Sequence, residues 1–112
     1  MLSTVNEDSF LKEVLQSSQP VLVHFWAPWC NLCLMINPLL EQLPQSLEKP
    51  IKLVSINADE NLKLANTYRL RTLPTLLFFE NGKLQKRLDN FQGRDGLFYG
   101  IKNLIQQDKI AG

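Results

Sequence analysis

Residues 21–33 of this 112-residue chain, VLVHFWAPWCNLC, predict a buried strand followed by a helix that begins at a cysteine pair. The run Val21–Trp26 is mostly apolar and rich in β-branched and aromatic side chains, which is typical of a buried strand. After Cys30 and Cys33, apolar residues recur at spacings of three and four, which predicts a helix: Met35, Ile36, Leu39, Leu40, Leu43 and Leu47. We expect Pro38 to kink this helix and Pro44 to end its regular part.

Helices and strands are also predicted on both sides of this unit. A first helix begins near Asn6 and ends by residues 17–20, residues 51–57 form a second strand, and residues 61–68 form a short helix. Residues 75–80 and 83–89 flank an Asn-Gly pair, the strongest short-range hairpin signal. An apolar stripe predicts a last helix from about Gly93: Leu97, Ile101, Leu104 and Ile105. The order predicts one α/β domain over residues 1–112, with a mixed sheet covered by helices on both faces.

Charge and hydropathy exclude several classes of protein. Twelve Lys and Arg against eleven Asp and Glu leave a net charge of +1, so we expect no nucleic-acid partner and no membrane partner. No apolar run approaches the ~18 residues of a membrane span, and residues 1–8 lack the features of a signal peptide, so we expect a cytoplasmic protein. We expect most of the C-terminal cations on solvated faces, with a docking patch as the alternative: Lys83, Lys86, Arg87, Arg94, Lys102 and Lys109.

Cys30 and Cys33 are the chain's two cysteines, and they are too close in sequence to stabilise the fold by cross-linking. Their i, i+3 spacing at a helix start places both sulfurs on one face, where a disulfide closes and opens with little backbone change. The positive end of the helix favours a thiolate at Cys30. The spacing also fits half of a zinc site, with His24 as the remaining candidate ligand, or two inert core thiols.

The stretch 21–33, followed by Met-Ile-Asn-Pro at 35–38, resembles the strand–Trp-Cys-x-x-Cys–helix segment of the thioredoxin family. Further similarity lies in Asn-Ala-Asp at 57–59, Arg-Thr-Leu-Pro-Thr at 71–75 and Phe-Glu-Asn-Gly at 79–82, and it extends from about residue 6 to residue 106. The resemblance implies the thioredoxin fold, a three-layer α/β/α sandwich with a sheet of four to five strands and four flanking helices. It favours the redox interpretation of the cysteine pair over the other two.

Site roles follow from the resemblance position by position. Cys30 is expected to be the exposed attacking thiolate, and Cys33 the more buried resolving thiol of a redox-active disulfide. Trp29 is expected at the rim of the site, in contact with the partner. Pro74 is expected to be the family's cis-proline opposite the disulfide, and the backbone of Leu73 to pair with an incoming peptide.

Six positions depart from the family's usual residues. Asn31-Leu32 replaces Gly-Pro between the cysteines, which leaves the redox potential open. The other departures are His24 for a buried Asp, Leu34 for a basic residue, Ser55 for a lysine that often pairs with that Asp, and Asn90 for a groove-lining glycine. Asn90 is therefore a candidate substrate-binding residue.

His24 has two interpretations. The strand alternation puts His24 on one face with Leu22 and Trp26, and the resemblance points it toward the back of Cys33. A core histidine satisfied by one hydrogen bond is the first interpretation. Proton exchange with Cys33 is the second, and burial then makes the neutral ring dominant at pH 7.

The predicted function is thiol–disulfide oxidoreductase, acting as a protein disulfide reductase through Cys30 and Cys33, with no cofactor or metal of its own. The expected partners are disulfide-containing proteins and a thioredoxin reductase or other electron donor, and the protein is expected to be a monomer. The alternative is a thioredoxin-fold binding or redox-regulatory module with little general reductase activity.

Overall fold

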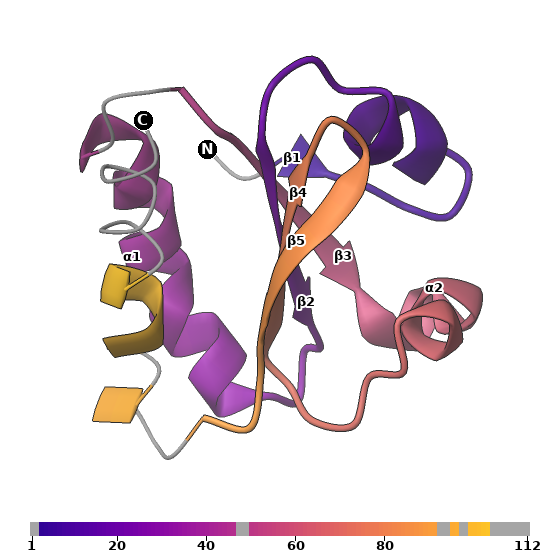
Figure 1. Cartoon of the computed structure of the whole chain (residues 1–112). Helices are drawn as coiled ribbons and strands as arrows, with labels where there is room; N and C mark the ends of the chain where they lie inside the picture. The colour runs from indigo at the N-terminus through magenta and orange to yellow at the C-terminus, as the bar shows by residue number, and fades with distance from the viewer. Residues whose placement is uncertain (1–2, 47–49, 92–94, 97–98, 104–112) are drawn as a thin grey trace.

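The computed structural model describes residues 3–46, 50–91, 95–96 and 99–103, with the backbone alone for residues 43–46. A five-stranded mixed sheet runs through the molecule in the order β1-β3-β2-β4-β5 (Figure 1). β1, β3 and β2 are mutually parallel, whereas β4 is antiparallel to both β2 and β5. The strands are β1 (Ser3–Thr4), β2 (Val21–Trp26), β3 (Lys52–Asn57), β4 (Thr75–Glu80) and β5 (Lys83–Leu88).

Helices cover both faces of the sheet, as Figure 1 shows. One face is covered by α1 together with the helical residues near the C-terminus, at 95–96 and 99–103, and the other by η1 and α2. The helices are η1 (Leu11–Leu15), α1 (Asn31–Ser46), η2 (Ala58–Glu60) and α2 (Leu62–Thr67). This arrangement confirms the α/β sandwich and the thioredoxin fold. None of the helices in the described part of the chain is long and apolar enough to cross a membrane.

Three local predictions differ from the structure. The edge strand β1 was not predicted, because two residues are too short to show a periodic pattern. Pro44 does not end α1, which continues to Ser46. The first helix is a π-helix over Leu11–Leu15, although the Asn6 side chain accepts from the backbone N–H groups of Asp8 and Ser9 at its expected start. Of the predicted last stripe, Ile101 is buried, whereas Leu97, Leu104 and Ile105 lie outside the described residues.

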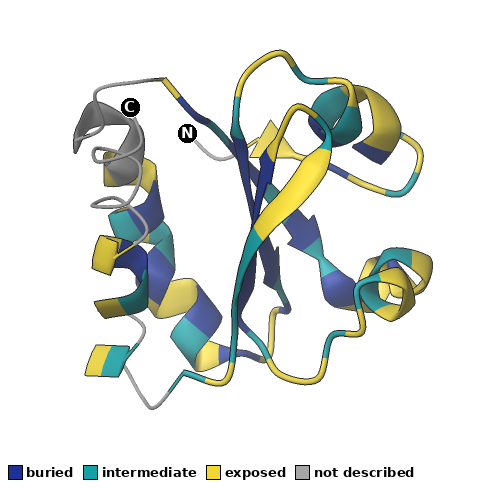
Figure 2. Cartoon of the chain, viewed as in Figure 1, coloured by how far each residue is buried: buried dark blue, intermediate teal, exposed yellow. Residues whose placement is uncertain are grey.

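The alternation of β2 divides the interior into two cores. The buried residues of β2 and its neighbouring strands are dark blue in Figure 2. Val21, Val23 and Phe25 belong to the core under η1 and α2. Leu22 belongs to the core under α1, where it packs with Ile36 and other apolar residues. Because successive side chains of a strand point to opposite faces, one six-residue strand supplies both cores, and His24 lies on the α1 face with Leu22.

The β4–β5 hairpin turns at Asn81 and Gly82, which have φ of 53° and 77°. Two successive positive φ values belong to the two-residue turn that matches the twist of hairpin strands. The turn brings β5 back along β4, so that the residues following Leu88 lie near the loop that precedes Thr75.

Candidate active site

Cys30 and Cys33 form a disulfide at the start of α1, with their Cα atoms 5.3 Å apart. Cys30 is 6% exposed and Cys33 is fully buried. The expectation that Cys30 is exposed is therefore wrong for the disulfide form, in which Cys30 is buried, although less completely than Cys33. The backbone N–H of Cys33 donates to the Cys30 sulfur at 3.1 Å. Since a donor aimed at a sulfur stabilises its anionic form, this geometry favours a thiolate at Cys30 when the pair is reduced. The two sulfurs therefore differ in both access and electrostatics.

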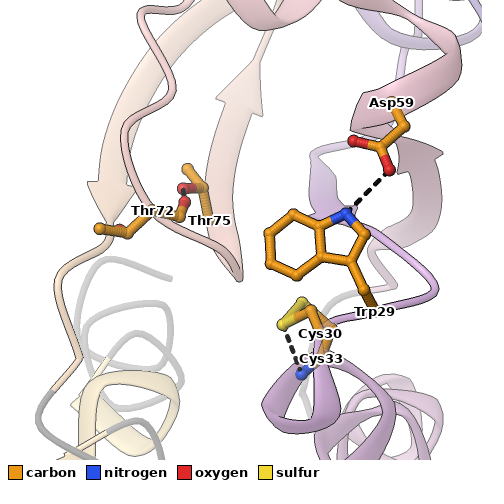
Figure 3. The surroundings of a disulfide bond; sticks show 6 residues. All are labelled: Trp29, Cys30, Cys33, Asp59, Thr72 and Thr75. Atoms are coloured by element: carbon orange, nitrogen blue, oxygen red, sulfur yellow. Dashed lines mark hydrogen bonds between the residues drawn. A yellow bond between two sulfur atoms is a disulfide. The ribbon is translucent and has the colours of Figure 1, made fainter.

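Trp29 lies beside the disulfide with two-thirds of its surface exposed. Its indole Nε1–H donates to Asp59 Oδ2 at 2.8 Å, which orients the ring between the cysteines and η2 (Figure 3). Asp59 is presented by η2, whose first turn is capped by the Asn57 side chain. Asp59 was part of the Asn-Ala-Asp similarity, but its contact with Trp29 was not predicted, because the two residues are thirty positions apart.

The loop before β4 lies across from the disulfide and Trp29 (Figure 3). Its Leu73–Pro74 peptide bond is cis, which confirms the expectation for Pro74. The Thr75 hydroxyl donates to the Thr72 carbonyl at 2.7 Å and closes the loop on itself. The loop thus presents Leu73 and Pro74 toward the cysteine motif.

A groove of about 340 Å³ lies between this loop and the cysteine motif. It brings together three predicted site residues, Leu73, Pro74 and Asn90, and the inter-cysteine residue Leu32; the full lining is Leu32, Thr72, Leu73, Pro74, Asn90 and Phe91. Phe91 was not singled out from sequence, because it reaches the groove only through the return of β5, and Thr72 was quoted only as part of the similarity at 71–75. Apolar side chains form most of the groove lining, and Thr72 and Asn90 add polar atoms. A lining of this composition suits the binding of a peptide segment.

Asn90 adopts a φ of 53° and is tied to the opposite wall of the groove. Its backbone N–H donates to Thr72 Oγ1 at 3.3 Å, and the Thr72 hydroxyl donates to Asn90 Oδ1 at 3.5 Å. Asn is among the few non-glycine residues that tolerate this backbone region, which accounts for its place where the family usually has glycine.

His24 is 1% exposed, and neither ring nitrogen has a hydrogen-bond partner among the described residues. The hydrogen bond expected of a satisfied core histidine is therefore not found among these residues, whereas its role in proton exchange stays a prediction. Burial lowers the pKa of His24 to about 4, so the ring is neutral at pH 7, as expected. Its register neighbours on the sheet are Ser55 and Leu76, and neither hydrogen-bonds to the His24 ring.

Cys33 lies on α1 and His24 on β2, and both elements contribute to the core that contains Leu22 and Ile36. Cys33 is buried one turn before Ile36 on the face of α1 that packs on the sheet, and His24 follows Leu22 on the sheet face that α1 covers.

In the disulfide neither sulfur is free to act as a thiolate ligand, and the described residues contain no group of three His, Cys, Asp or Glu able to hold a metal ion. The chemistry that the arrangement supports is thiol–disulfide exchange.

Comparisons with known proteins agree with this geometry. Residues 1–103 match the family model described as Thioredoxin. A thioredoxin of Rickettsia bellii is 38% identical over 105 residues, which cover 94% of this chain and all of that protein. Thioredoxin 1 of Synechococcus elongatus is 42% identical over 81% of this chain and 82% of that protein, and thioredoxin 1 of a Nostoc species is 46% identical over 70% and 74%.

Proposed function

The chain belongs to the thioredoxin family and is a thiol–disulfide oxidoreductase, and on this premise we propose that Cys30 is its attacking thiol and Cys33 its resolving thiol in the reduction of protein disulfides. The single observation that supports this assignment is the asymmetry of the pair. Cys30 is the less buried residue, and its sulfur accepts the Cys33 N–H, whereas Cys33 is fully buried.

The exchange balances in two steps. The Cys30 thiolate attacks one sulfur of the substrate disulfide, a Cys30–sulfur bond forms, the substrate S–S bond breaks, and the leaving thiolate takes up a proton. Cys33 then loses its proton and attacks the Cys30 sulfur, so that the Cys30–Cys33 bond forms and the second substrate thiolate leaves. Two electrons pass from the pair to the substrate. Thioredoxins act on disulfide substrates and receive electrons from a reductase, which returns the pair to the dithiol.

Substrate binding is assigned to the surfaces on either side of the disulfide. The exposed ring of Trp29 forms one side, and the groove at Leu73, Pro74 and Asn90 forms the other. A peptide that pairs with the Leu73 backbone in strand fashion has its side chains directed into this groove. Its cysteine is then held next to Cys30, so that the mixed disulfide forms without a further search.

His24 is assigned to proton exchange with Cys33. Neither nitrogen of this buried ring has a partner among the described residues, so the nitrogen that carries no proton in the neutral ring is free to accept the proton that Cys33 loses. Because the pKa of His24 is about 4, a free imidazolium is costly there, and proton transfer has to accompany the attack of Cys33 rather than precede it. The buried Asp of the family is replaced here by a base that is neutral at pH 7.

Alkylation and trapping test the cysteine roles. In the reduced protein Cys30 should react with iodoacetamide faster than Cys33 and should titrate below the ~8.5 of a free cysteine. Cys33→Ser should accumulate a mixed disulfide with insulin, whereas Cys30→Ser should not. Equal alkylation of both thiols, or trapping by Cys30→Ser, contradicts the assignment.

Rapid mixing tests His24. The proposal predicts that His24→Leu slows decay of the mixed disulfide more than its formation, most clearly between pH 6 and 8. Ser55→Ala serves as the matched control, because Ser55 is the register neighbour of His24 and has no assigned role. A resolving rate that is unchanged in His24→Leu makes His24 a packing residue.

We further propose that residues 1–112 act as one domain and as a monomer in the cytoplasm, with a thioredoxin reductase as electron donor. Both cores pack against a single sheet, which supports one domain. A reducing compartment suits a disulfide that has to be reopened in each cycle. Sedimentation velocity tests the monomer, and turnover with NADPH and a thioredoxin reductase tests the donor.

A further inference from the structure

Arg87 on β5 does not behave as a solvated surface cation. Its guanidinium donates from Nη1 to the Tyr68 carbonyl, from Nη2 to the Arg69 carbonyl at 2.8 Å, and from Nε to Asp89 Oδ2 at 2.8 Å. Its side chain is 30% exposed, whereas Lys83 on the same strand is exposed. All three guanidinium nitrogens are therefore used within the protein, which the sequence analysis did not predict for this residue.

The two carbonyls that Arg87 binds belong to the end of α2. Tyr68 is the C-cap of α2, and Arg69 follows with a φ of 51°. The last carbonyls of a helix have no partner within the helix, and a charged donor in a fixed fork is a strong one. Arg87 thus fixes the point where the chain leaves α2, five residues before Pro74.

A second connection holds the same loop at its middle, at Thr72. Asn90, three residues after Arg87, bonds through its backbone N–H to Thr72 Oγ1 at 3.3 Å. Thr72 in turn accepts from the Thr75 hydroxyl through its carbonyl at 2.7 Å. The segment 69–75 is therefore bound to β5 at Arg69, through Arg87, and to the residues after β5 at Thr72, through Asn90.

The ring of Tyr68 packs against aromatic rings of the core. It lies 5.7 Å from the ring of Phe10 and 5.8 Å from that of Phe79, measured between centroids. The start of the loop is thus held by apolar contacts of the Tyr68 ring and by Arg87 at the Tyr68 carbonyl. Between this anchored start and Thr75, the loop supplies Thr72, Leu73 and Pro74 to the groove beside the disulfide.

We propose that Arg87 is a positioning residue for exchange with protein disulfides: it holds the loop at 69–75 so that Leu73 and Pro74 face the Cys30–Cys33 pair. This role rests on the proposed binding of substrate peptides at that groove. Arg87 itself touches neither the disulfide nor the groove, so its effect is confined to substrates that use the loop. A small disulfide reagent needs only access to the Cys30 sulfur and is indifferent to the loop.

The test compares two substrates in two variants. Arg87→Met keeps the apolar stem and removes all three donors, and Lys86→Met is the matched control, because Lys86 is a neighbouring cation of the same strand with a partly exposed side chain. We expect kcat/KM for insulin reduction to fall about tenfold in Arg87→Met, the size of a lost charge-assisted hydrogen-bond pair. We expect reduction of 5,5′-dithiobis(2-nitrobenzoate) to stay within about twofold, and Lys86→Met to match the wild type in both assays.

Two further measurements separate positioning from general loss of stability. Amide hydrogen exchange at residues 70–75 should rise in Arg87→Met, while that of β2 stays unchanged. Arg87→Lys, which keeps a charged donor but not the fork, should retain more insulin activity than Arg87→Met. It also provides the same two-substrate comparison if Arg87→Met does not fold.

The outcomes are distinct. A selective loss with insulin supports the positioning role. Unchanged insulin reduction, or equal losses with insulin and the small reagent, overturns the positioning role and leaves the proposed function standing. A wild-type protein that reduces neither substrate overturns the proposed function, and the positioning role with it.

Discussion

Replacing His24 with leucine should stabilise the protein, and by more at acidic pH than at neutral pH. His24 is 1% exposed with both ring nitrogens unpartnered among the described residues. A buried polar group without a hydrogen bond costs about 1–3 kcal/mol, and leucine at this position removes that cost and adds apolar contact on the α1 face. We therefore expect His24→Leu to raise the free energy of unfolding at pH 7.5 by about 1–3 kcal/mol.

The pH dependence follows from the pKa of His24, which burial lowers from 6.5 to about 4. Between these values the unfolded chain binds a proton that the native state does not, so the stability of the wild type is lost as the pH falls from 6.5 toward 4. The loss reaches about 2 kcal/mol at pH 5 and levels off near 3 kcal/mol below pH 4. His24→Leu lacks this loss, so its advantage over the wild type should grow by those amounts.

Urea unfolding of the two oxidised proteins, followed by tryptophan fluorescence at pH 7.5, 6.5, 5.5 and 5.0, measures the difference. Carboxylates titrate in both proteins, and the difference between the two curves cancels their contribution. An NMR titration of the His24 ring reports its native pKa directly. An advantage of His24→Leu that is the same at all four pH values, or a ring that titrates near 6.5, refutes the reasoning.

Three other substitutions test separate parts of the structure. Gly82→Ala should lower the free energy of unfolding, measured in urea, by about 2 kcal/mol. The reason is that an added Cβ meets the Leu15 carbonyl oxygen at 2.5 Å and that Gly82 has a φ of 77°. An unchanged midpoint of urea unfolding contradicts the turn geometry. Asp59→Ala frees the Trp29 ring and should reduce insulin kcat/KM about threefold with less than 1 kcal/mol of destabilisation, since the contact is exposed; equal activity would show that the ring needs no support. Ile36→Ala leaves a cavity under α1, where the residue is 1% exposed, and should cost about 3–4 kcal/mol in the same unfolding assay, so a loss below 1 kcal/mol is incompatible with the described core.

The features that the sequence predicted well are local along the chain. Val21–Trp26 was predicted with its observed bounds, since a run of β-branched and aromatic residues needs no distant partner to be recognised. The turn at Asn81 and Gly82 was predicted because a tight hairpin turn requires positive φ at two successive positions, and Asn followed by Gly adopts these values readily. The cysteine pair was likewise found from its spacing and its place at a helix start.

Only the tertiary structure decided which residues meet across the groove and which stay unpartnered. Arg87 was expected in solvent, but its fork meets the carbonyls of Tyr68 and Arg69 because the β4–β5 hairpin returns along the end of α2. Asn90 reaches Thr72 across eighteen residues for the same reason. A His24 without a function was expected to have a hydrogen-bond partner. Its ring has none among the described residues. That outcome depends on which side chains of β3, β4 and α1 surround the ring, and the sequence of one segment does not contain this information. The sequence alone determined the strand, the turn and the reactive pair, because each is set by neighbours in the chain; the shape and support of the site depended on packing between segments far apart in it.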